Sequence, residues 1–154
     1  MAVVLRIETN VEPSKDDYQA ILVPLLDYNQ ARTGLAGSEE LAILVKDEAG
    51  STKGGLYAKT SGQWLFVELL VVPEFARRQG LGAELMSEAE ALAREKGCQG
   101  IWLDTFSFQA PEFYLRLGYT VFGELEDYPV AGYSRLFMQK RLDLNTPDAS
   151  SVQP

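Results

Sequence analysis

The 154-residue sequence contains no histidine and only one cysteine, Cys98. The lack of histidine excludes Ser-His-Asp and Cys-His catalysis, histidine-ligated metal sites and a histidine general base, and we expect no metal. One cysteine cannot form an internal disulfide, which indicates a reducing compartment. Because Cys98 follows Gly97 at the end of a helical pattern, we interpret it as a small packed hydrophobic residue, not as a nucleophile.

Positive charge and long apolar runs are also scarce. The chain has 14 Lys and Arg against 22 Asp and Glu, a formal net charge of −8, which argues against binding to nucleic acid or to anionic lipid. No run approaches the roughly 18–20 apolar residues that a membrane span needs, and the start MAVVLRIETN does not resemble a signal peptide. We therefore expect a cytoplasmic protein. Its acidity would suit a cationic substrate, but solubility alone also explains it.

The first half of the chain predicts a strand, a helix and an antiparallel meander. Residues 2–9 are rich in β-branched residues and are typical of a strand. Ser14 and Asp17 form a capping-box pattern before apolar residues at helical spacing, and Pro24 should kink or split this helix. The segment 41–72 indicates three strands, because the turn sequences DEAGS and TSGQ interrupt it.

The second half alternates helices and strands. After the meander the order is helix, strand, helix, strand, strand, which predicts a mixed α/β fold whose mixed sheet has helices on its faces. The length and the 46% of apolar residues suit one domain, 1–142, with a polar, disordered tail at 143–154. The expected elements are a helix at 82–96, a strand at 99–105, a short helix at 110–118 and strands at 119–129 and 133–142.

The junction between the third strand and the following helix carries two arginines and two glycines. The glycines do not fit a Walker loop or a complete dinucleotide fingerprint. They could serve a tight turn alone. An anion site is the alternative, since the first turn of a helix offers unpaired N–H groups and the positive end of the dipole, and glycines let a ligand approach the backbone. The junction reads Arg77-Arg78-Gln79-Gly80-Leu81-Gly82.

This junction resembles the acetyl-CoA-binding signature of the GNAT superfamily of N-acetyltransferases, [RQ]-x-x-G-x-[GA]. A second family segment matches at Ala110, Phe113, Tyr114, Gly118 and Tyr119. The resemblance covers about residues 40–142. It implies a GNAT fold, with a mostly antiparallel sheet of six to seven strands whose two central parallel strands, 65–72 and 99–105, splay apart to admit the cofactor.

The resemblance also implies the residues that bind acetyl-CoA, the co-substrate. Backbone N–H groups of the signature loop would hold the pyrophosphate, the preceding strand would pair with the pantetheine amides, and Ser107 stands where the family often has an asparagine. The implied cofactor-binding residues are Leu70, Val71, Val72, Arg77, Arg78, Gln79, Gly80, Leu81, Gly82 and Ser107.

Acetyl transfer to an amine needs a proton acceptor for the amine and benefits from a donor for the departing thiolate. Tyr114 matches the family's tyrosine that faces the sulfur of coenzyme A, so we expect it to be the general acid. Glu68 is the only carboxylate in the apolar strand 64–72 and is our candidate base. A partly wet position or a salt bridge would equally explain it. Asp104 and water are the further candidates for the base.

The resemblance implies a primary amine of a small molecule as the acceptor, attacked directly in a ternary complex, and a homodimer. The family's acceptor pocket corresponds to Tyr28, Asn29, Arg32 and the segment 124–133, whose Glu124, Glu126 and Asp127 could attract a cation or simply be solvated. Trp64, Trp102, Phe106 and Phe108 are interpreted mainly as core residues.

A non-catalytic acyl-CoA-binding sensor is the alternative function. A toxin that acetylates aminoacyl-tRNA conflicts with the acidic charge. The sequence does not name the acceptor amine.

Overall fold

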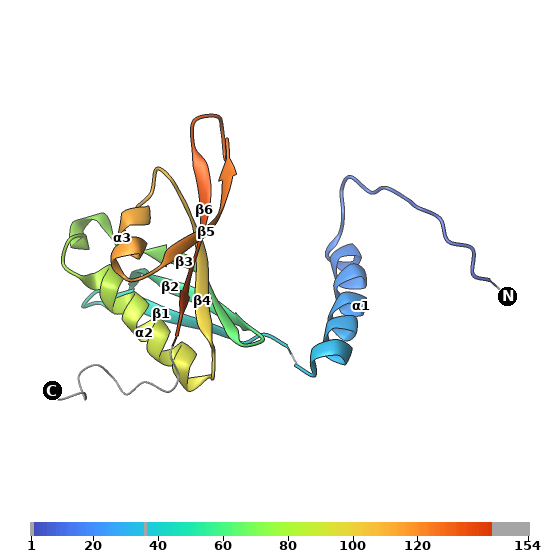
Figure 1. Ribbon diagram of the computed structural model, residues 1–154, viewed down its shortest axis with the longest axis horizontal. Coiled ribbons are helices and arrows are strands. Elements are labelled where there is room, and N and C mark those ends of the chain that lie inside the picture. The colour runs from blue at the N-terminus through green and yellow to red at the C-terminus, as the bar shows by residue number, and fades with distance from the viewer. Residues whose placement is uncertain (1, 36, 143–154) are drawn as a thin grey trace. The chain divides into compact units, whose positions relative to one another are not determined.

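The computed structural model describes residues 2–35 and 37–142, and the expected tail at 143–154 lies outside these residues. The chain divides into two units, Met1–Gly37 and Ser38–Pro154 (Figure 1). We describe each unit separately. The candidate chemistry lies in the second.

The first unit contains one helix, α1 (Lys15–Thr33). The expected capping box is confirmed, since Ser14 Oγ accepts from the Asp17 N–H at 3.1 Å and the Ser14 N–H donates to Asp17 Oδ2 at 2.8 Å. These bonds lower the pKa of Asp17. The helix ends at Gly34 in the left-handed conformation, as helices commonly do.

In this unit the expected strand is wrong, and of the expected kink or split at Pro24 the split does not occur. Residues 2–9 form no strand; β-branched composition is not sufficient, because a strand also needs a partner for its backbone hydrogen bonds. Pro24 does not split the helix, which runs on both sides of it from Lys15 to Thr33. Proline disfavours a helix interior by only about 3 kcal/mol, which the remaining turns of a long helix can offset.

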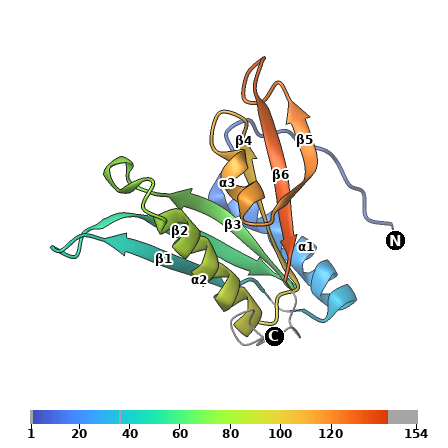
Figure 2. The same ribbon diagram turned by 60° about the vertical axis from the view of Figure 1, so that its left-hand side comes forward.

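The second unit is built on a six-stranded mixed sheet in the order β1-β2-β3-β4-β6-β5 (Figures 1 and 2). The expected meander is confirmed, and every neighbouring pair is antiparallel except β3 with β4. The mixed α+β class is therefore as predicted. The strands are β1 (Glu40–Lys46), β2 (Thr52–Ser61), β3 (Trp64–Val71), β4 (Gly100–Phe106), β5 (Thr120–Glu126) and β6 (Ser134–Arg141).

Two helices, α2 (Leu81–Glu95) and α3 (Pro111–Arg116), and a short 3₁₀ turn, η1 (Glu74–Ala76), complete the unit. Pro111 opens α3, as expected, because a first-turn N–H has no partner within the helix and proline loses nothing by lacking one.

Cys98 is 1% exposed, and burial raises the pKa of its thiol, which agrees with a packed residue. The buried face of α2 packs on β2, β3 and β4, and the core is Leu56, Ala58, Leu65, Val67, Leu85, Met86, Ala89, Ala93, Cys98, Ile101, Leu103, Tyr119, Met138 and Leu142.

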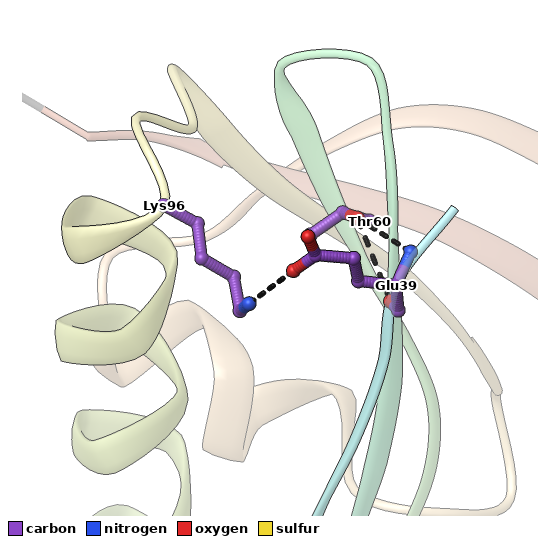
Figure 3. A network of polar contacts seen from close by, with 3 residues as sticks. All are labelled: Glu39, Thr60 and Lys96. Carbon is purple, nitrogen blue, oxygen red and sulfur yellow. Dashed lines mark hydrogen bonds and ion pairs between the residues drawn. The ribbon is translucent and has the colours of Figure 1, made fainter. Parts of the chain in front are cut away.

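The C-terminal end of α2 is tied to the start of β1. Lys96 forms an ion pair with Glu39, whose backbone N–H and C=O contact the Thr60 hydroxyl on β2 (Figure 3). A lysine at this end of a helix also meets the negative end of the helix dipole. The contact thus links the C-terminal end of α2 to the edge of the sheet.

The two central strands separate part of the way along their length. β3 and β4 pair from Trp64 with Gly100 to Val67 with Leu103, and no further. β3 continues to Val71 and β4 to Phe106, and the two strands diverge in Figure 2. The predicted splay of the parallel strands is therefore confirmed.

Candidate active site

The signature loop forms a turn that only unusual backbone angles permit. Arg78 has φ +65° and Gly80 has φ +81°, both in the left-handed region. Gly80 is the N-cap of α2 and provides no side-chain cap. The positive φ of Gly80 is the reason for a glycine there, since no atom lies within 4 Å of the position of a Cβ.

Consecutive backbone N–H groups of this turn are free to bind a ligand. Within residues 2–35 and 37–142, no acceptor bonds to the backbone N–H of Arg78, Gln79, Gly80, Leu81, Gly82 or Ala83. The first bond of α2 is that of the Glu84 N–H to the Gly80 carbonyl. Unpaired N–H groups at the positive end of a helix dipole form a site for an anion such as a pyrophosphate.

The second glycine of the loop has a different role. A Cβ at Gly82 would lie 3.1 Å from Phe113 Cζ on α3 and 3.6 Å from a Val72 methyl group. Gly82 therefore lets α2 and α3 approach at the end of β3. The sequence-based interpretation, that the glycines let a ligand approach, accounts for Gly80 but not for this packing.

The arginines are exposed beside the loop. Arg77 Nε donates to the Val72 carbonyl oxygen at 3.4 Å, so this side chain supports the turn. Arg78 is exposed, and its charge adds to the positive field of the helix N-terminus.

The edge of β3 that faces β4 is open past Val67. Leu70 pairs with Leu56 and Val71 with Gly55 on the β2 side, while β4 has already turned away. Backbone N–H and C=O groups alternate between the two edges of a strand. The stretch Leu70–Val72 can therefore offer backbone groups to an extended ligand between the strands.

Glu68 is the extra residue of a β-bulge. Val67 pairs with Ala58 and Leu69 with Tyr57, so Glu68 has no partner on β2. Its side chain is exposed and forms no ion pair with any described residue. Of the open alternatives for this residue, the exposed position agrees with the wet one and the salt bridge is not found among the described residues, because the bulge breaks the strand alternation and turns the carboxylate towards water.

Asp104 occupies the matching position on β4, one residue past the last pair. Both of its carboxylate oxygens contact Arg135 on β6. Oδ1 accepts a hydrogen bond from the Arg135 Nε–H at 3.0 Å, and Oδ2 lies 2.9 Å from a terminal nitrogen of the same guanidinium. This bond raises the pKa of Arg135. A carboxylate bound at both oxygens is a weaker candidate for the base than the free carboxylate of Glu68.

Tyr114 lies on α3 with its ring packed against two aromatic neighbours. The ring centres are 5.0 Å from Phe113 and 6.0 Å from Tyr119. Burial, followed by the nearby charge of Asp104, raises the pKa of Tyr114 to about 12. The phenol is therefore protonated at neutral pH and able to donate a proton or a hydrogen bond.

Ser107 connects the end of β4 to the start of β6. Its N–H donates to the Ser134 carbonyl oxygen at 2.8 Å, and its Oγ accepts from the Ser134 N–H at 3.0 Å. The hydroxyl hydrogen is not used in these bonds, so it can still donate to a ligand. Its role in pantetheine binding stays a prediction.

Aromatic residues expected mainly in the core are partly exposed. Phe106 stacks on Phe108 and Tyr128 at ring distances of 5.1 and 5.8 Å, near the open end of β4. On the sheet itself, a hollow of about 370 Å³ is lined by Trp64, Trp102, Phe122, Phe137 and Gln139. The core interpretation is thus wrong for Phe108, which is 53% exposed, and incomplete for the two tryptophans.

The predicted acceptor residues fall in different parts of the chain. Tyr28, Asn29 and Arg32 lie near the end of α1, where the Arg32 guanidinium is 4.8 Å from the Tyr28 ring centre. Glu124 and Glu126 are exposed on β5. Asp127 supports the hairpin turn, because its Oδ1 accepts from the Gly132 N–H at 3.3 Å. The roles of these residues towards an acceptor stay predictions.

Proteins that resemble this chain in sequence or fold include acetyltransferases. The model of the acetyltransferase (GNAT) family matches residues 10–119. An acetyltransferase of Agrobacterium fabrum is 39% identical over 123 residues, covering 80% of this chain and 89% of that protein. The blasticidin-S acetyltransferase of Streptomyces morookaense is 45% identical over 103 residues, covering 66% and 76%. The crystal structure of an acetyltransferase from Bacillus cereus has a TM-score of 0.79 at 37% identity, covering 90% of this chain and 98% of that one.

The chain belongs to the GNAT acetyltransferase family, and acetyl transfer is its class of activity. Within the described residues, no group of His, Cys, Asp and Glu side chains could hold a metal ion. No helix among these residues combines the length and the hydropathy of a membrane span.

Proposed function

We propose that this protein is an N-acetyltransferase that moves the acetyl group of acetyl-CoA to a primary amine of a small molecule, by direct attack in a ternary complex. The observation that carries the proposal is the row of unpartnered backbone N–H groups from Arg78 to Ala83, at the N-terminus of α2. When bound, acetyl-CoA supplies an activated acetyl thioester. We also propose that residues 1–142 act as one domain, since the family match at 10–119 includes parts of both units.

In this proposal, different residues bind different parts of acetyl-CoA. The N–H groups of Arg78 to Ala83 hold the pyrophosphate, with Arg77 and Arg78 adding positive charge. The open edge at Leu70, Val71 and Val72 binds the pantetheine amides between the splayed strands. Ser107 can donate its hydroxyl hydrogen to the same arm.

Tyr114 donates a proton to the departing thiolate. A thiol has a pKa of about 8.5 and an unperturbed phenol of about 10, and burial raises the pKa of Tyr114 to about 12. The phenol therefore keeps its proton at neutral pH and can donate a hydrogen bond to the sulfur as charge develops there; because its pKa lies above that of the thiol, complete proton transfer requires the phenolate to be stabilised or reprotonated from water. Phe113 and Tyr119 hold the ring in place.

Glu68 accepts the proton of the amine, directly or through water. Its carboxylate is exposed and free of ion pairs within the described residues, at the residue where β3 and β4 begin to separate. Asp104 is the second candidate, although Arg135 occupies both of its oxygens. Loss of the amine proton to bulk water is the third.

Similarity to the blasticidin-S acetyltransferase supports a small-molecule acceptor and makes blasticidin S the first compound to test. A thiol-release screen across amines, with acetyl-CoA as donor, tests the proposed function. We expect turnover with at least one amine and a loss of about 10²-fold or more in Tyr114→Phe. Binding of acetyl-CoA by calorimetry without turnover on any amine would instead support an acyl-CoA sensor. No heat with either acetyl-CoA or coenzyme A would reject the ligand itself.

A further inference from the structure

A largely buried polar network joins α2, β6 and Tyr119, which lies between α3 and β5. The phenolic O–H of Tyr119 donates to Oε1 of Glu90 on α2 at 3.1 Å, and Nζ of Lys140 on β6 donates to the same oxygen at 2.9 Å. Tyr119 is 1% exposed and Glu90 is 9% exposed. Burial, and then the charge of Glu90, raise the pKa of Tyr119, so its hydroxyl remains a donor.

Stability alone does not explain this network. Removing a carboxylate and an ammonium from water costs free energy that their attraction offsets only in part, and well-packed apolar residues of similar volume often do as well. An ion pair fixes positions more narrowly than apolar contacts do, because its hydrogen bonds have defined distances and angles. Such a network is suited to holding a neighbouring side chain in place.

Tyr119 is in direct contact with Tyr114. Its backbone N–H donates to the Tyr114 carbonyl oxygen at 3.0 Å, after Gly118 turns the chain with φ +94°. The two rings meet edge to face, with centres 6.0 Å apart and planes at 74°. The Tyr119 ring thus forms one wall of the space that the Tyr114 ring occupies.

Glu90 belongs to the helix that begins at the signature loop. Gly82 and Glu90 are both in α2, and a helix of this length behaves as a rigid rod over a few turns. The bonds of Glu90 to Tyr119 and Lys140 therefore fix the distance between two parts of the site: the backbone N–H groups of the loop, and the helix α3 that carries Tyr114. A proton donor must lie within about 2.6–3.2 Å of its target, and a displacement of about 1 Å can cost about 10²-fold in rate.

We propose that Tyr119, held by Glu90 and Lys140, is a positioning residue that places the phenol of Tyr114 relative to the loop that binds the cofactor. The inference rests on the proposed function, in which Tyr114 is the general acid. Tyr119 itself does not touch the reacting atoms. It acts through Tyr114, and a test must separate this effect from a general loss of stability.

The first test is kinetic. Tyr119→Phe removes only the hydroxyl group and keeps the ring and the backbone bond. We expect kcat for acetyl transfer to fall about 10-fold with KM for acetyl-CoA within about 2-fold of the parent. Cys98→Ala, a buried change outside the network, is the control and should leave kcat unchanged. An unchanged kcat in Tyr119→Phe, or an equal fall in both variants, overturns the proposal.

A double-mutant cycle gives the sharper result. If Tyr119 acts through Tyr114, adding Tyr119→Phe to Tyr114→Phe should not lower kcat further, whereas independent effects would multiply. Multiplying effects overturn the proposal. If Tyr119→Phe does not fold, Lys140→Gln replaces it, because this change leaves both rings in place. The same fall in kcat is expected, and an unchanged kcat is again a contradiction.

A spectroscopic readout keeps the test independent of turnover. In protein labelled with carbon-13 tyrosine, the Tyr114 ring signal is assigned by its loss in Tyr114→Phe. Tyr119→Phe retains the neighbouring aromatic ring, so a shift of the Tyr114 signal, absent in Cys98→Ala, would report movement of Tyr114. An unmoved signal overturns the positioning role. A parent without turnover on any amine rejects the proposed function alone.

Discussion

Val67 on β3 and Leu103 on β4 are the last residues that pair between the two parallel strands. The residues that follow them, Glu68 and Asp104, flank the point where the strands separate. One carboxylate is exposed in a bulge and the other is bound by Arg135. The point where the strands separate therefore has an exposed carboxylate on β3 and an ion-paired carboxylate on β4.

Glu68→Gln should leave stability within about 0.5 kcal/mol of the parent, because Glu68 is exposed and makes no ion pair within the described residues. It should lower kcat/KM by about 10²-fold or more at neutral pH, as expected for loss of a general base. Urea denaturation measures the stability, and thiol release measures kcat/KM. Full activity in Glu68→Gln would reject this base and leave Asp104 or water.

Asp104→Asn should show the opposite pattern. It breaks the contact with Arg135 and leaves a partly buried guanidinium without its carboxylate, at a cost on the order of 1–3 kcal/mol in unfolding free energy. We expect a smaller fall in kcat/KM than in Glu68→Gln. A larger fall in kcat/KM in Asp104→Asn than in Glu68→Gln, at preserved stability, would make Asp104 the candidate base in place of Glu68.

Gly80→Ala should weaken cofactor binding. Alanine at φ +81° is strained by about 1–2 kcal/mol, although its Cβ would meet no atom within 4 Å. Relief of this strain would turn the backbone N–H groups away, so we expect KM for acetyl-CoA to rise about 10-fold. Gly50→Ala is the matched control, since Gly50 has φ +83° and equally open space. Equal effects of the two changes on KM would contradict the prediction.

Gly82→Ala should act through packing. Its Cβ would lie 3.1 Å from Phe113 Cζ, and Phe113 packs against Tyr114. We expect a loss of about 1–3 kcal/mol in unfolding free energy, together with a fall in kcat. Phe113→Leu should restore part of the stability in the double variant, as urea denaturation would show. Simple addition of the two losses would indicate that the contact is not the cause.

Tyr114 should make stability depend on pH in the alkaline range. Burial, followed by the charge of Asp104, raises its pKa from 10.0 to about 12 in the folded state. The unfolded chain therefore loses this proton first, and the contribution of Tyr114 is fully present below pH 10 and is lost as pH rises towards 12. Two pKa units correspond to about 2–3 kcal/mol.

The measurement compares the parent with Tyr114→Phe. Urea denaturation at about pH 9 and about pH 11.5 should show a steeper fall in the parent, because only the parent carries the buried Tyr114 phenol. Parallel falls in the two proteins would mean that Tyr114 is not shifted. Over the same range, kcat should not decline through deprotonation of Tyr114 near pH 10.

Local features of the fold could be predicted residue by residue. The Ser14–Asp17 box and Pro111 mark helix starts because each satisfies or removes an orphan N–H group of a first turn. The turns DEAGS and TSGQ separate the strands of the meander. The signature loop was also recognised, since its glycines, arginines and helix start are adjacent in the sequence.

Features that depend on partners distant in the sequence were missed or misread. Residues 2–9 have strand composition but no strand partner. For Glu68 the sequence leaves a base, a partly wet position and a salt bridge open, and only the register of β2 reveals the bulge that exposes it. The bond of Tyr119 to Glu90 joins residues 29 positions apart. Gly118 and Tyr119 belong to the second family segment, but nothing in the spacing of that segment indicates a contact with a carboxylate on the preceding long helix.

The sequence by itself determined most of the helices and strands, where most of them begin, and which loop joins β3 to the N-terminus of α2. These properties depend on torsion angles and hydrogen bonds between residues close along the chain. Only the tertiary structure decided where β3 leaves β4, which carboxylate stays free and what surrounds Tyr114. Such properties depend on strand register and on side chains from separate elements, and they arise only when the sheet and its helices pack together.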